Sequence, residues 1–102
     1  MKILGVTSCP SGVAHTYMAA EALEKAAKDK GWQVKIETQG SIGIENELSQ
    51  SEVDSADMII LTRDLAIKNE QRFSNKKVVR VSVSDAVKKA PQIMEKIAEH
   101  LK

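Results

Sequence analysis

A single cysteine followed by turn-forming and hydroxyl-bearing residues is the part of this sequence best suited to chemistry. From Gly5 to Ala20 the chain reads GVTSCPSGVAHTYMAA, with Cys9 close behind a short apolar run. Pro10 and Gly12 interrupt extended backbone just before a helical pattern begins. This order of strand, tight loop and helix predicts that Cys9 lies where the N-terminus of a helix can meet an anion.

A thiol becomes a good nucleophile only when it ionises, and the predicted surroundings of Cys9 favour the thiolate. The positive end of the helix dipole would face the sulfur, and His15 would add positive character when protonated or donating a hydrogen bond. The same surroundings would hold a phosphoryl group on sulfur, because Ser11 and Thr16 offer hydroxyl donors and Gly12 lets the backbone approach closely. The predicted site therefore has Cys9 as its catalytic residue and Pro10, Ser11, Gly12, Val13, Ala14, His15 and Thr16 as its phosphate-binding residues.

Two alternatives remain open at this point. A lone cysteine at the end of a strand is often a small buried apolar residue, although the turn formers and donors around Cys9 favour a reactive thiol. His15 can contact the phosphate directly, or it can cap the helix and pack on the loop, since imidazole does both.

Composition excludes several classes of function. The chain has 102 residues, a formal net charge of +1 and one residue each of Trp, Tyr and Phe, which argues against a nucleic-acid interface. One cysteine cannot form an internal disulfide, and with two distant histidines it provides no metal-ligand cluster, so neither metal nor other cofactor is expected. No apolar run could span a bilayer, and the start of the chain has no signal-peptide pattern. We expect one cytoplasmic domain, residues 1–102.

Periodicity predicts alternating strands and helices. Gly31 follows a helical pattern as a left-handed C-terminal glycine would, Ser49 and Glu52 form a capping-box pattern, and Pro91 fits the first turn of a final helix. A turn of helix is expected over 45–48, and Ser84 with Asp85 is expected to cap a turn that ends at Lys89. The predicted strands cover 2–6, 32–38, 58–62 and 78–82, and the predicted helices cover 16–30, 49–56, 68–73 and the segment after Pro91.

This alternation predicts an α/β fold, a small doubly wound parallel sheet of four strands with helices on both faces. The expected strand order is 2-1-3-4. The alternating pattern of 32–38 favours a half-exposed edge strand with Glu37 on its solvent side. Ligands of such sheets bind beyond the carboxyl ends of the strands, where Cys9 would meet the loops that begin at Gln39 and Thr62.

A cysteine in a phosphate-binding loop can serve either a phosphatase or a phosphoryl relay. Low-molecular-weight tyrosine phosphatases have a phosphate-clamping arginine where this chain has His15, and they use an Asp-Pro acid. None of the five aspartates here is followed by proline: Asp29, Asp54, Asp57, Asp64 and Asp85. A loop without the guanidinium clamp and the acid should hold phosphate but hydrolyse it slowly, which favours a relay.

The segment CPSGVAHTYMAAEAL, from Cys9 to Leu23, closely resembles the signature of the fructose-family IIB domain of the bacterial sugar phosphotransferase system. The similarity continues through ETQGS at 37–41 and ADMIIL at 56–61, and it covers essentially the whole chain. Ser11 stands where the family usually has threonine, which keeps a hydroxyl. The chain end at Lys102 is expected to mark a free-standing IIB chain or an excised domain.

The resemblance implies a phosphotransferase that works through phosphocysteine. Cys9 would accept a phosphoryl group from a phosphohistidine on a IIA domain and pass it to fructose or a fructose-like sugar bound by the membrane IIC subunit. The protein would then associate transiently with the inner face of the membrane. Partners are expected to touch the loop rim at Pro10, Ser11 and Val13, together with the 39–41 loop.

The residues leave two other functions open. One is a cysteine phosphatase of the low-molecular-weight kind, which His15 disfavours. The other is a IIB-like regulatory module in which phosphorylation of Cys9 is a signal. The identity of the sugar does not follow from the sequence.

Overall fold

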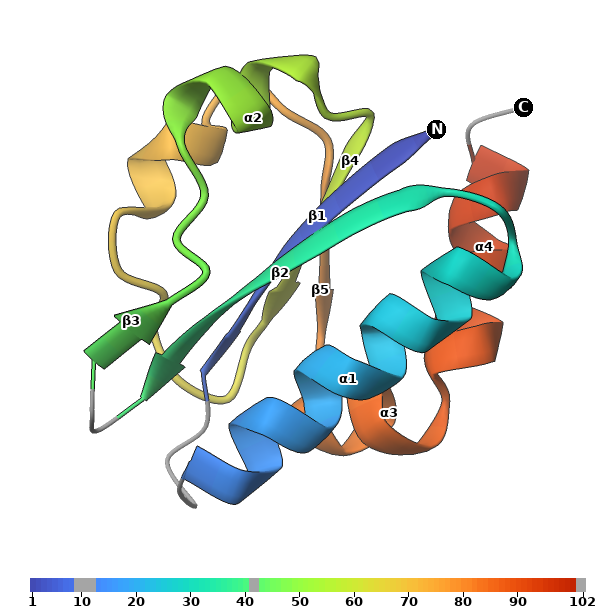
Figure 1. Ribbon diagram of the computed structural model, residues 1–102, viewed down its shortest axis with the longest axis horizontal. Helices are drawn as coiled ribbons and strands as arrows, with labels where there is room; N and C mark the ends of the chain where they lie inside the picture. The colour runs from blue at the N-terminus through green and yellow to red at the C-terminus, as the bar shows by residue number, and fades with distance from the viewer. Residues whose placement is uncertain (9–12, 41–42, 101–102) are drawn as a thin grey trace.

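A mixed sheet of five strands is the centre of the computed structural model, which describes residues 1–8, 13–40 and 43–100 (Figure 1). The strand order is β3-β2-β1-β4-β5, in which β2, β1, β4 and β5 run parallel and β3 runs antiparallel to β2. The predicted order of the four parallel strands is therefore confirmed. The strands are β1 (Lys2–Ser8), β2 (Gln33–Gly40), β3 (Gly43–Glu45), β4 (Met58–Thr62) and β5 (Val78–Val81).

Strand β3 corrects the prediction of a four-stranded, wholly parallel sheet. It pairs with β2 only over Thr38–Gly40, so β2 is an edge strand along its first half and an inner strand at its carboxyl end. The predicted turn of helix at 45–48 is wrong, because Glu45 ends β3 and no helix begins before Gln50. The segment Gly43–Glu45 has only three residues, which are too few for a periodic pattern to indicate a strand.

Helices cover both faces of the sheet (Figure 1). One face carries α1 (Val13–Asp29), α3 (Val83–Lys88) and α4 (Ala90–His100), and the other carries α2 (Gln50–Ser55) and the 3-10 helix η1 (Glu70–Phe73). The uninterrupted apolar run of β4 is buried throughout, as a central parallel strand requires. Gly5 in β1 permits close packing, since a Cβ there would lie 2.8 Å from Ile36 Cδ1 and 3.1 Å from the carbonyl oxygen of Ile60.

Helix ends agree with the local chemistry, with three corrections. Gly31 adopts the left-handed conformation after α1 (φ 77°), and the Ser49–Glu52 capping box is present at α2. Helix α1 begins at Val13, three residues before the predicted start. Helix α3 is capped by Ser82, whose Oγ accepts a hydrogen bond from Asp85 N at 3.0 Å, and not by Ser84. The helix predicted at 68–73 is the shorter η1.

No helix in the described part of the chain is both long enough and apolar enough to cross a membrane.

Candidate functional site

The site predicted from the sequence lies at the carboxyl end of β1, the central strand. Ser8 ends this strand and Val13 begins α1, so the two elements flank the loop that carries Cys9. Cys9, Pro10, Ser11 and Gly12 themselves lie outside the described residues. The structure therefore defines the two elements that position the predicted nucleophile.

Thr62, the last residue of β4, holds the end of β1 immediately before Cys9. Its Oγ1 accepts a hydrogen bond from Ser8 N at 2.9 Å and donates one to the Ser8 carbonyl oxygen at 3.2 Å. Ser8 and Thr62 are both buried. Sequence reasoning placed a loop here but gave Thr62 no role; the available signal was a hydroxyl residue at the end of a buried parallel strand.

The first turn of α1 contains the four described residues of the predicted phosphate site: Val13, Ala14, His15 and Thr16. The amides of a first helical turn have no acceptor within the helix, and they lie at the positive end of its dipole. Ala14 and His15 are exposed, whereas Thr16 is buried and its carbonyl oxygen accepts a hydrogen bond from Thr7 Oγ1 at 3.1 Å. The phosphate-binding roles of these four residues remain predictions, and the side chain of His15 is accessible to solvent.

Strand β2 brings Gln39 into register with Ser8 at the same edge of the sheet. Gln39 Nε2 donates to the Lys68 carbonyl oxygen at 3.0 Å, and Gln39 Oε1 accepts from Lys68 N at 2.8 Å. The side chain is buried and its amide binds the segment before η1. Gln39 thus joins β2 to the segment before η1, and it lies within β2 and not in the loop predicted to begin at this residue. Ser41, which was expected beside it on the partner surface, lies outside the described residues.

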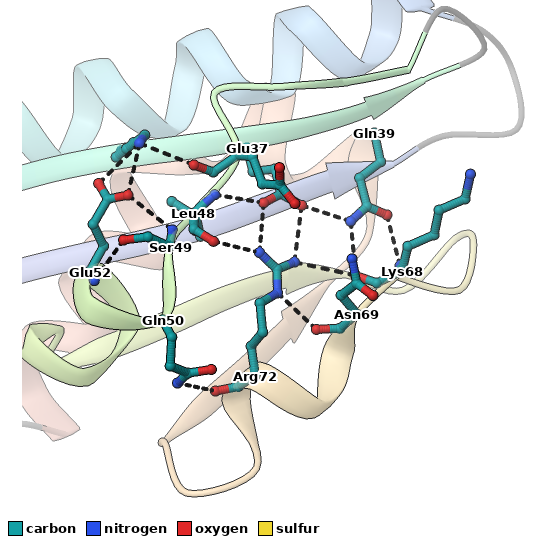
Figure 2. Close-up of polar contacts among 11 residues, drawn as sticks. Glu37, Gln39, Leu48, Ser49, Gln50, Glu52, Lys68, Asn69 and Arg72 are labelled. Atoms are coloured by element: carbon teal, nitrogen blue, oxygen red, sulfur yellow. Dashed lines mark hydrogen bonds and ion pairs between the residues drawn. The ribbon is translucent and has the colours of Figure 1, made fainter.

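A buried ion pair next to Gln39 also connects β2 to η1 (Figure 2). Arg72 of η1 donates through Nη1 to Glu37 Oε1 at 2.8 Å and through Nη2 to Glu37 Oε2 at 3.1 Å. Glu37 also accepts from Leu48 N at 2.8 Å and from Gln39 Nε2 at 2.8 Å. Its side chain has no exposed surface, so the predicted solvent-facing position of Glu37 is wrong.

The network explains how Glu37 can be buried. Burial raises the pKa of its carboxyl group, but hydrogen bonds from Arg72, Leu48 N and Gln39, together with the charge of Arg72, outweigh burial and lower the pKa. Arg72 also donates to the carbonyl oxygens of Leu48 at 2.9 Å and Asn69 at 2.8 Å. The ion pair therefore connects β2, the β3–α2 loop and the β4–β5 loop as one unit.

Apolar side chains and a pocket surround the site on the α1 and α3 side. Tyr17, Met18 and Leu65 are three of the large apolar residues that the described part of the chain leaves exposed. Met18 also lines a pocket of about 400 Å³, whose other lining residues are His15, Asp64, Val83, Ser84, Val87 and Lys88. Asp64 Oδ1 accepts a hydrogen bond from Val83 N at 2.7 Å, which holds the loop after β4 against the start of α3.

Tyr17 links α1 to the β2–β3 hairpin. Its hydroxyl group donates a hydrogen bond to Glu45 Oε1, and this bond, with burial and the negative charge of Glu45, raises the pKa of Tyr17. This contact joins α1, which follows the Cys9 loop, to β3, which follows the β2–β3 loop. Among the described residues, no three His, Cys, Asp or Glu side chains gather as a metal site would require.

These features define the chain as an α/β domain whose central parallel strand leads through a short loop into the N-terminus of a helix, an arrangement suited to phosphate. Known proteins with this arrangement match it closely. A family model described as "PTS system, Lactose/Cellobiose specific IIB subunit" matches residues 4–96. The chain is 69% identical over 100 residues to the PTS system fructose-like EIIB component 2 of Escherichia coli, with 98% of this chain and 94% of that protein covered.

Two further comparisons agree. The chain is 46% identical to the fructose-like PTS system EIIBC component of Escherichia coli, over 95% of this chain and 20% of that protein. The solution structure of the Enzyme IIB subunit of a PTS system from Escherichia coli superposes with a TM-score of 0.93 at 40% identity, covering 98% of this chain and 93% of that one.

The chain therefore belongs to the fructose-like IIB components of the sugar phosphotransferase system (PTS), subunits that act as phosphotransferases in sugar uptake. This confirms the predicted family. The family model names lactose and cellobiose while the relatives are named fructose-like, so membership of the family does not specify the sugar.

Proposed function

We propose that this chain is a single-domain phosphocarrier in which Cys9 accepts a phosphoryl group from a IIA phosphohistidine and passes it to a sugar. In the first step the N–P bond of the donor breaks as an S–P bond to the Cys9 thiolate forms. In the second step the S–P bond breaks as the sugar hydroxyl oxygen bonds to phosphorus, and the hydroxyl proton is released. Sulfur returns to the thiolate, so the site is ready for another cycle.

One observation carries the proposal: the first turn of α1 begins directly after the Cys9 loop, at the carboxyl end of the central strand. Amides of this turn are available to stabilise charge on a transferring phosphoryl group, and transfer of this kind depends mainly on positioning and charge stabilisation. The hydrogen bonds between Thr62 and Ser8 fix the strand end next to the nucleophile. The proposed phosphate-binding residues are those of the loop and of the first helical turn.

Two partners must reach Cys9 in turn. We assign the acceptor to the sugar in a membrane IIC subunit, because a relative named EIIBC component contains a segment like this chain within a longer protein. We assign the donor to a IIA domain, as the family resemblance implies. The exposed Tyr17, Met18 and Leu65, with the pocket that Met18 lines, offer a transient contact surface of modest size. The protein would work in the cytoplasm at the inner face of the membrane.

Intact-mass measurement tests the first step. Wild-type protein is mixed with phosphorylated IIA, and Cys9→Ser is the matched control because Cys9 is the chain's one cysteine. The gain of one phosphoryl group in the wild type, and none in Cys9→Ser, is the expected result. Equal labelling of both proteins would reject Cys9 as the acceptor.

The same preparation separates the relay from the two other functions. A phosphatase would release phosphate steadily from an aryl phosphate and accumulate no adduct, whereas a relay keeps the adduct until an acceptor is added. A regulatory module would take up phosphate but would not pass it on. Onward transfer to sugar in membranes that contain IIC is therefore the expected final result, and its absence would favour the regulatory function.

A further inference from the structure

Strand β5 leaves one edge of the sheet open. It is the last strand in the order β3-β2-β1-β4-β5, and it pairs with β4 on its inner side (Figure 1). The carbonyl oxygens of Lys77 and Val81 accept hydrogen bonds from Ile59 N and Arg63 N of the β4 side, at 3.0 and 2.9 Å. Because backbone groups alternate sides along a strand, the N–H and C=O groups of Val78 and Arg80 point away from β4. These groups are free to pair with another extended chain.

A groove runs along this open edge, between β5 and the helices α3 and α4. It has a volume of about 340 Å³, and its floor is formed by the apolar side chains Val79, Val81, Ile93 and Ile97. Val81, Ile93 and Ile97 belong to the buried core, so the floor of the groove is continuous with the core. Alternate side chains of an added strand would face this floor.

The rim of the groove is strongly cationic. Arg63, Arg80, Lys89 and Lys96 line it, against Asp85 as the one carboxylate among its lining residues. Within the described part of the chain, Arg63, Lys89 and Lys96 have no carboxylate within ion-pair distance, whereas Arg80 pairs with Glu70 at 2.8 Å. Three cations without counter-charges around an apolar floor favour an acidic ligand over a neutral one.

We propose that the β5 edge and its groove bind an extended acidic segment of a partner protein, which adds to the sheet as a further strand beside β5. The open N–H and C=O groups of Val78 and Arg80 supply main-chain hydrogen bonds, and the cationic rim selects acidic side chains. A second copy of this chain is a poor occupant, because pairing two β5 edges would bring the same cations together. Strand β4 lies between the groove at β5 and β1, the strand that leads to Cys9. Binding of a partner segment at the groove is therefore a different function from phosphoryl transfer.

An NMR titration tests the proposal with a synthetic peptide of about eight residues that alternates Glu and Val, a usual strand length. The control peptide replaces every Glu with Lys. We expect saturable binding of the acidic peptide and slower amide exchange at Val78 and Arg80. Binding should weaken about tenfold in the double variant K89E/K96E. It should stay unchanged in K25E/K28E, which makes the same charge change on exposed positions of α1.

Two substitutions at one position separate charge from backbone. Proline is tolerated on the open side of an edge strand, and Arg80→Pro removes a donor that β4 does not use. Compared with Arg80→Ala, which removes only the side chain, Arg80→Pro should weaken binding about tenfold further. Should Arg80→Pro fail to fold, amide protection at Arg80 in the wild type decides the question.

The proposal is overturned by any of three results. The first is no saturable binding of the acidic peptide, which would mean that the cations only keep other strands from this edge. The second is binding without protection of the Val78 and Arg80 amides, as expected for an anion held by the rim alone. The third is concentration-dependent self-association that protects the same amides, because a second copy would then occupy the edge.

Discussion

Glu37 is a fully buried carboxylate whose charge is balanced by the guanidinium group of Arg72. Replacement with Gln keeps the size of the side chain but leaves the cation of Arg72 without its counter-charge. We expect Glu37→Gln to lower the free energy of unfolding by about 3–5 kcal/mol, measured by urea denaturation. The control Glu70→Gln breaks the exposed pair with Arg80 and should cost no more than about 1 kcal/mol. Similar losses in both variants would contradict a structural role for the buried pair.

The same carboxyl group predicts a pH dependence of stability. Its pKa in the folded state lies below the ordinary value of 4.5, so ionised Glu37 stabilises the fold above that pH and this contribution is lost as the pH falls through the folded-state pKa. The difference in unfolding free energy between wild type and Glu37→Gln should therefore be largest near neutral pH and shrink in acid. A difference that stays constant from neutral pH to pH values well below 4.5 would contradict this assignment.

His15 is exposed in the first turn of α1, beside the Cys9 loop. We expect His15→Ala to slow phosphorylation by IIA about tenfold or more, because a donor near the phosphoryl group is lost, while the circular dichroism spectrum stays unchanged. Time-resolved intact mass gives the rate. His100→Ala, which changes the other histidine of the chain, is the control and should react at the wild-type rate. An unchanged rate in His15→Ala would remove this residue from the site.

Strand β1 packs against its neighbours at Gly5 with no room for a methyl group. In Gly5→Ala the new Cβ would lie 2.8 Å from Ile36 Cδ1 and 3.1 Å from the carbonyl oxygen of Ile60. We expect a loss of about 1–3 kcal/mol in unfolding free energy. Adding Ile36→Val, which removes Cδ1, should recover part of the loss but not all, because the carbonyl oxygen remains. An additive effect of the two substitutions would mean that the strands separate instead.

Element types and their order followed from the sequence, because long apolar runs and helix ends carry strong local signals. The buried run of β4, the capping box of α2 and the glycine after α1 all lie where local chemistry predicts them. Strand β3 could not be predicted, since its pairing with Thr38–Gly40 is a tertiary contact of a three-residue segment. The burial of Glu37 escaped prediction for the same reason: alternation placed it on the solvent side, and its partner Arg72 lies in a distant, weakly periodic segment.

The site followed from the sequence only in outline. The turn formers after the first strand indicated where Cys9 sits in the fold, and the first turn of α1 is next to that loop. The sequence did not reveal the side-chain contacts that hold the elements around the Cys9 loop. Thr62 reaches Ser8 only because the strand order places β4 beside β1. Gln39 bonds to Lys68 in the segment before η1, where the sequence shows little periodicity.

Exposed apolar side chains lie on elements next to the Cys9 loop: Tyr17 and Met18 near the start of α1, and Leu65 shortly after β4. Met18 is half exposed and also lines the pocket with His15 and Asp64. If this surface receives the phosphorylated donor, Met18→Gln should raise the KM for phosphorylated IIA about tenfold and leave kcat nearly unchanged. Lys25→Gln, on the solvent side of α1, should leave both constants unchanged. A fall in kcat without a change in KM would contradict the docking role.

The ion pair between Glu37 and Arg72 also limits how this sequence can diverge. The two residues are 35 positions apart in the chain, yet a change at either one leaves a buried charge alone. Single-step replacement at one position is therefore disfavoured, whereas simultaneous replacement of both by apolar residues of similar volume can preserve the fold. The pair acts as an epistatic unit, and neutral drift at these two positions has to pass through a double change.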